Sequence, residues 1–71
     1  MLLDEVLYME VRLFRAFLDR FKMNPSEAYA LFEQHGIWDY VESCYEVLHM
    51  SGDEYVLNDV HQILIRNGAM I

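Results

Sequence analysis

The stretch MNPSEAYALFEQHG, residues 23–36, contains the start and the stop signals of one complete helix. Asn24 can cap the helix, Pro25 suits its first position, and Glu27 completes an Asn-x-x-Glu capping box. Apolar residues then recur at helical spacing until Gly36, which suits the left-handed residue that ends many helices. This stretch therefore predicts a short amphipathic helix with defined ends.

Similar punctuation divides the rest of the chain, and no segment alternates in the manner of a strand. The pattern predicts four helices, over about residues 3–22, 25–35, 37 to 48 or 49, and 51–67. Ser51 and Glu54 have capping-box spacing at the start of the last helix. An alternative keeps residues 55–57 extended and starts this helix after Asn58 or Asp59.

The first predicted helix has an apolar arc that covers most of its circumference, so we expect this helix to be central. We therefore expect an all-α fold, a compact bundle of four short helices in one domain, residues 1–71. The third helix should turn one face inward, made of Ile37, Tyr40, Val41, Cys44, Val47 and Leu48.

The apolar content of the chain is high for its size. Of its 71 residues, 55% are apolar, against an ordinary level of about 45–50%. A domain this small buries only about 60% of the surface that its unfolded chain exposes. Some large apolar side chains should therefore lie at the surface or against a partner, which favours a function in association.

The charge of the chain excludes several classes of partner. Five basic and twelve acidic residues give a net charge of −7, which argues against nucleic acid and against anionic membranes. A basic protein surface is the natural complement of such a chain. The start MLLDEVLYMEVRLF has no basic region before its apolar residues, and no charge-free run is long enough for a membrane span. With a single cysteine, Cys44, the chain can form no internal disulfide, and we expect a cytoplasmic location.

The third helix carries the residues that we predict to bind a partner. Trp, Tyr and Met are enriched at interfaces, and acidic side chains would steer the chain toward a basic surface. The predicted partner-binding residues are Trp38, Asp39, Glu42, Tyr45, Glu46 and His49. His49 has a simpler interpretation as the last residue of this helix, where the helix dipole favours an imidazolium.

Glu10 is an anomalous polar residue, because it interrupts the apolar arc of the first helix between Val6, Phe14 and Phe17. A buried carboxylate is costly unless it is paired or hydrogen-bonded. It could accept a bond from a Tyr hydroxyl, the Trp38 indole, a His or a capped helix end. Alternatively it contacts a partner, or it is an acid of raised pKa that faces a pocket.

The sequence predicts no catalytic residue, no metal site and no cofactor. His35, His49, His61 and Cys44 include no Cys-x-x-Cys or His-x-x-x-His pair. Acid–base catalysis normally needs a second acidic or basic group, and the sequence places none at a recognisable spacing from Glu10.

The stretch MNPSEAYALFEQHGIWDYVESCYEVLHMSGDEYVLNDV resembles a family of small bacterial proteins of unknown function. Its scattered pattern matches the chain at Met9-Glu10, Leu31-Phe32, Gly36, Trp38-Asp39-Tyr40, Tyr45 to His49, Gly52 and Asn58-Asp59. The chain departs from the family's usual Thr after His by having Met50. Some members look like neighbours of genes for ADP-ribosyltransferase-like proteins, so the resemblance implies an antitoxin or accessory role.

Three functions remain in view. The first is a non-enzymatic interaction module for a protein with a basic surface, such as an antitoxin-like partner of a toxin-like enzyme. The second is a structural homodimer that buries the surplus apolar residues against a second copy. The third, ranked well behind these, is a small enzyme that uses Glu10 and a histidine.

Overall fold

The helix predicted from residues 23–36 is present in the computed structural model, which describes residues 2–71 and the side chains of residues 4–71. It is α2, Pro25–Gln34, with Asn24 as its N-cap. The Asn24 side chain accepts a hydrogen bond of 2.8 Å from the amide of Ser26. Gly36 follows with φ 68°, a left-handed conformation that costs glycine little.

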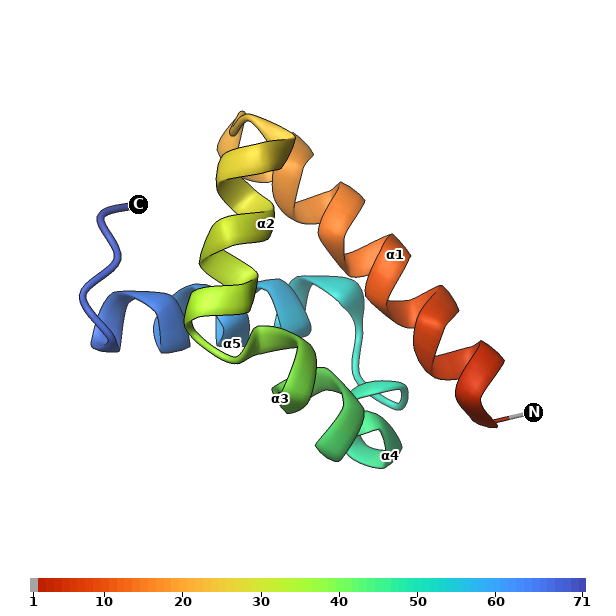
Figure 1. Ribbon diagram of the computed structural model, residues 1–71. Helices are drawn as coiled ribbons and strands as arrows, with labels where there is room; N and C mark the ends of the chain where they lie inside the picture. Colours follow the sequence, from red (N-terminus) through yellow and green to blue (C-terminus); the bar gives the residue numbers. More distant parts are fainter. Residues whose placement is uncertain (1) are drawn as a thin grey trace.

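Within residues 2–71 the chain forms five helices (Figure 1): α1 Leu2–Phe21, α2 Pro25–Gln34, α3 Ile37–Ser43, α4 Tyr45–Leu48 and α5 Asp53–Arg66. The all-α prediction is therefore confirmed, with five helices in place of four. The radius of gyration is 11.4 Å, close to the value of about 11 Å expected for a compact chain of this length.

The predicted third helix is interrupted at Cys44, whose φ of −107° and ψ of 16° are not helical. The interruption turns α4 so that Leu48 enters the core at 2% exposed, whereas Val47, predicted to face inward, is 66% exposed. Neither glycine nor proline marks this position. The turn places the end of α4 where the chain can lead into α5.

The last helix starts at Asp53, two residues after the start that the main prediction gave it. Residues 55–57 are helical, so the extended alternative is wrong. The predicted Ser51 capping box is also wrong, because Gly52 is the N-cap. The Ser51 hydroxyl instead donates to the carbonyl of Val47 over 3.2 Å.

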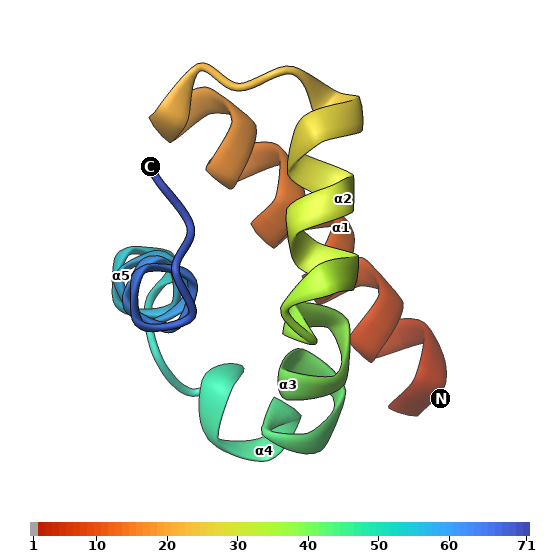
Figure 2. The same ribbon diagram turned by 60° about the vertical axis from the view of Figure 1, so that its left-hand side comes forward.

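One hydrophobic core joins the helices. α5 passes behind α2 in Figure 1 and is seen end-on in Figure 2, with α1 and α2 on the other side of the core. Phe17 from α1 and Phe32 from α2 are fully buried, with ring centroids 5.0 Å apart in an edge-to-face arrangement. Such pairs contribute about 0.5–1.5 kcal/mol beyond the burial of their area. The core is completed by Met9, Leu13, Ala28, Ile37, Val41, Leu48, Val56, Leu57, Val60 and Leu64.

The apolar arc of α1 is only partly covered. Its inner residues reach the core, but Leu7 is 57% exposed and Val11 is 47% exposed. Other large apolar residues that remain exposed are Tyr8, Tyr29, Val47, Met50, Tyr55, Ile65 and Met70. The prediction that large apolar side chains lie at the surface is confirmed.

No helix within residues 2–71 is both long enough and apolar enough to cross a membrane.

Candidate partner-binding groove

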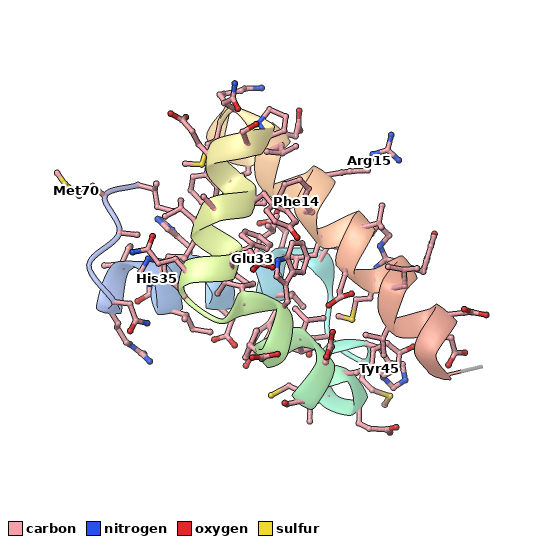
Figure 3. The ribbon with its side chains drawn as sticks, viewed as in Figure 1. Phe14, Arg15, Glu33, His35, Tyr45 and Met70 are labelled. Carbon is pink, nitrogen blue, oxygen red and sulfur yellow. The ribbon has the colours of Figure 1, made fainter. Side chains whose placement is uncertain are left out.

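The six predicted partner-binding residues do not share one surface. Trp38 and Glu42 of α3 line a groove with α1 and α2. Tyr45 and His49 line a second hollow, beside the N-terminal half of α1 (Figure 3). The interruption at Cys44 produces this division, because it turns α4 away from the direction of α3. Asp39 and Glu46 are exposed and line neither hollow.

The first of these, which we call the acidic groove, has an open volume of about 470 Å³. Its lining comes from three helices, α1, α2 and α3, and combines apolar or aromatic residues with carboxylates. The lining residues are Leu7, Glu10, Val11, Phe14, Tyr29, Glu33, Trp38 and Glu42.

Aromatic rings form the floor of the acidic groove. The half-buried Phe14 lies between α1 and α2 (Figure 3), with its ring centroid 5.8 Å from that of Trp38. Tyr29 approaches Trp38 from the side, with centroids 5.8 Å apart. Below them Trp38 packs on the buried Phe32 at 4.9 Å. The rings hold Trp38 in place, and its indole Nε1 is buried with no hydrogen-bond partner among residues 4–71.

Glu10 meets another carboxyl group at the rim of this groove. The side chain is half-buried, so the anomaly expected from the sequence is present in a milder form. Burial raises the pKa of Glu10, as do repulsion from the Glu42 carboxylate and a hydrogen bond that protonated Glu10 donates to Glu42. The predicted partners, a Tyr hydroxyl, the Trp38 indole, a His or a helix end, make no hydrogen bond to Glu10 within the described side chains.

The second hollow is of mixed charge. Its lining residues are Asp4, Glu5, Tyr8, Met9, Arg12, Tyr45 and His49. His49 is the C-cap of α4, as predicted for a helix-ending residue. Its ring stacks on that of Tyr45, with centroids 4.8 Å apart and planes at 8°, and its Nδ1 lies 3.0 Å from the Tyr45 carbonyl. Two carboxylates, Asp4 and Glu5, and one guanidinium, Arg12, line this hollow, so it is less acidic than the groove with its three carboxylates and matches a basic partner less well.

Four side-chain contacts between distant parts of the chain join helices that the sequence does not connect. Tyr40 donates a hydrogen bond to the Asp59 carboxylate and so joins α3 to α5. Burial and this bond raise the pKa of Tyr40. Arg12 pairs with Asp53 at 2.6 Å, and Arg20 contacts both Glu54 and Asn58 at 3.1 Å. Such pairs cannot be predicted from residue spacing within one helix, because the two partners lie on separate helices.

The histidines lie apart from the acidic groove. His61 packs on Phe21 with ring centroids 4.7 Å apart, and its Nε2 lies 3.3 Å from the carbonyl of Ile71. Within residues 4–71 no group of three or more His, Cys, Asp or Glu side chains is arranged to hold a metal ion.

Residues 9–67 match the family described as Protein of unknown function (DUF3791). The chain belongs to this family. The match spans all three carboxylates and all three aromatic residues that line the acidic groove. Comparison with curated proteins and with solved structures gives no match. Because the function of this family is unknown, the match assigns no activity to the chain.

Proposed function

We propose that this chain is a non-enzymatic protein-interaction module whose partner presents a basic surface. The observation that carries the proposal is the acidic groove, where an aromatic floor lies beside three carboxylates, Glu10, Glu33 and Glu42. Interfaces are built from aromatic contact area combined with charge complementarity, and the groove offers both.

The surroundings of the groove support this proposal. Leu7 and Val11 are about half exposed and extend the apolar floor along α1. A net charge of −7 adds a long-range attraction for a basic partner. Leu7, Val11 and Phe14 follow one another at steps of four and three along α1, a spacing suited to contact with an amphipathic helix.

The test is a selection of random 16-residue peptides displayed on phage, with the wild-type chain as bait. The selected peptides are then measured against the double variant Leu7→Gln/Val11→Gln. Glutamine keeps the helix propensity of α1 and leaves the core untouched, while it removes apolar area from the groove. We expect affinity to fall at least tenfold, about 1.4 kcal/mol.

The matched control is Val47→Gln/Met50→Gln, which also removes two exposed apolar residues, but outside the groove. This control should bind the peptides as the wild type does. If no peptide is selected, or if both double variants bind equally well, the groove is not a docking site and the proposal is wrong.

A narrower form of the proposal makes the chain an antitoxin-like or accessory partner of a toxin-like enzyme in the cytoplasm. It rests on the family resemblance, in which some members look like neighbours of genes for ADP-ribosyltransferase-like proteins. The test is to purify the protein encoded by the neighbouring gene and to measure its activity with and without the chain. Inhibition that disappears with Leu7→Gln/Val11→Gln is expected, and an unchanged activity would contradict this form.

A structural homodimer is the second candidate, favoured by the exposed apolar residues Leu7, Tyr8 and Val11 on α1. Two copies would each bring a charge of −7 to the contact, which opposes self-association. An enzyme that uses Glu10 and a histidine gains no support, because no histidine lines the acidic groove.

A further inference from the structure

Among the side chains of residues 4–71, carboxylates line the acidic groove and no cationic side chain does. Its lining residues include Glu10, Glu33 and Glu42, and neither lysine nor arginine. Three of the chain's five basic side chains have carboxylate partners elsewhere: Arg12 with Asp53, Arg20 with Glu54 and Lys22 with Asp19. The other two are Arg66, in the last turn of α5, and Arg15, which points away from the body of the molecule (Figure 3). The negative charge of the groove is thus left for an external cation to balance.

Two of these carboxyl groups are close enough to disturb each other. Glu10 of α1 and Glu42 of α3 face across the groove, and repulsion between them adds to the raised pKa of Glu10. A cation between two carboxylates replaces this repulsion with two attractions. Glu10 is half-buried, so water screens an attraction to its carboxylate less than it screens an ion pair between two exposed side chains.

The aromatic rings of the groove floor favour a guanidinium group over an ammonium group as the cation. Trp38 and Tyr29 present π systems beside the carboxylates, and Trp is the ring that attracts cations best. A guanidinium group is planar, stacks on aromatic faces and donates hydrogen bonds to two carboxylates from one fork. An ammonium group is a compact, strongly hydrated charge and would use the aromatic surface less well.

We propose that the acidic groove binds an arginine side chain of the partner, with the guanidinium between Glu10 and Glu42 and against the ring of Trp38. This rests on the proposed function and names the chemistry of the partner at that same site. The remaining length of the groove, along Leu7 and Val11, takes the apolar residues that flank this arginine.

The experiment is a titration of the chain with N-acetyl-arginine amide. N-acetyl-citrulline amide, which has the same shape without the charge, is its comparison, and added sodium chloride keeps the ionic strength constant. Trp38 is the only tryptophan, so its fluorescence and its indole N–H resonance report on this one site. We expect saturable changes at millimolar concentrations of the arginine amide, as befits a small fragment, and none with the citrulline amide.

Two variants of equal net charge locate the site. Glu10→Gln/Glu42→Gln removes the carboxylates that would hold the guanidinium, and we expect affinity to fall at least fivefold. Asp39→Asn/Glu46→Gln removes the same charge from exposed positions outside the groove, and its affinity should stay within twofold of the wild type. N-acetyl-lysine amide should bind more weakly than the arginine amide.

An equal response to the citrulline amide, or an equal loss of affinity in both double variants, would overturn the inference. Equal binding of lysine and arginine amides would overturn the choice of a guanidinium. These outcomes are distinct from failure of the proposed function. Peptides that require Leu7 and Val11 but bind equally well with citrulline in place of arginine would leave the function standing and remove only this inference.

Discussion

At the scale of single residues, Glu10 is where stability and binding compete. Folding places its carboxyl group on a partly apolar surface and close to the Glu42 carboxylate. Both effects penalise the charged form, and the fold gains nothing from either of them. The charge of Glu10 therefore lowers the stability of the unbound chain, but it would strengthen the binding of a partner that supplies a positive charge.

Replacement of Glu10 by glutamine should therefore stabilise the chain at neutral pH. The pKa of Glu10 is raised above its usual 4.5 in the folded state, so its contribution to stability is present below pH 4.5 and is lost as the pH rises through the folded pKa. We expect Glu10→Gln to gain less than about 1 kcal/mol at pH 7, since the carboxyl group still reaches solvent. The gain should vanish below about pH 4. Urea unfolding at several pH values measures it, and a variant less stable than wild type at pH 7 would contradict this account of Glu10.

Tyr40 stabilises the fold, whereas the charge of Glu10 destabilises it. The Tyr40 hydroxyl donates a hydrogen bond to the Asp59 carboxylate. Tyr40→Phe should lower the free energy of unfolding by about 1–2 kcal/mol, since a half-buried carboxylate loses its donor. The raised pKa of Tyr40 means that its stabilisation is present below pH 10 and is lost as the pH rises further. The wild type should therefore lose stability above pH 10 more steeply than Tyr40→Phe does. Tyr29→Phe is the control, and an equal effect of both substitutions would refute this role of Tyr40.

At the scale of elements, the connections between helices depend on different backbone requirements. Gly36 joins α2 to α3 with φ 68°, whereas Gly52 precedes α5 with φ −72°. A Cβ at either position would meet no atom within 4 Å, so space does not distinguish the two glycines. Backbone conformation should therefore be the main difference between the two positions when a methyl group is added.

Gly36→Ala should accordingly destabilise the chain by about 1–2 kcal/mol, because the left-handed conformation is unfavourable for alanine. Gly52→Ala should have a smaller effect, because the φ of −72° suits alanine and the restriction of the unfolded chain offsets the weaker preference of alanine for the N-cap position. Thermal unfolding of both variants measures the difference. Equal destabilisation by the two substitutions would show that the α2–α3 connection does not depend on the conformation of Gly36.

The elements also show which features could be predicted from sequence. Asn24, Pro25 and Gly36 define the ends of α2 through local chemistry, and these predictions are confirmed. The interruption at Cys44 could not be predicted, because the helical pattern of apolar residues continues through this position. The helix breaks there all the same, and Leu48 packs into the core.

Only some residues of the candidate site could be predicted, because the site forms where three separate helices pack together. Glu10 stood out from the pattern of its own helix, but its neighbour Glu42 lies on another helix and at no characteristic spacing. Trp38 and Glu42 of the predicted set line the acidic groove, whereas Tyr45 and His49 lie in a different hollow. The lining residues Tyr29 and Glu33 of α2 were not chosen, since only the packing of α2 beside α1 and α3 brings them to the groove.

At the scale of the whole molecule, a net charge of −7 predicts an association rate that depends on salt. Between about 0.05 M and 0.5 M salt, screening should reduce the association rate of a basic partner peptide at least tenfold. The dissociation rate should change less, because apolar contact in the groove is not screened. Stopped-flow mixing monitored by Trp38 fluorescence measures both rates, and an association rate unchanged by salt would refute electrostatic steering.

The solution mass distinguishes the two whole-molecule arrangements. Charge repulsion between identical copies predicts a monomer by light scattering at low salt over a wide concentration range. A stable dimer under these conditions would mean that the exposed apolar residues of α1 serve self-association.

The most direct test of the central claim is to map a selected peptide onto the isotope-labelled chain by NMR. We expect the largest amide and indole shifts to cluster around the acidic groove, at Glu10, Val11, Phe14, Tyr29 and Trp38. Shifts that cluster on α5 or around Tyr45 and His49, with the groove unaffected, would contradict the claim that this groove is the binding site.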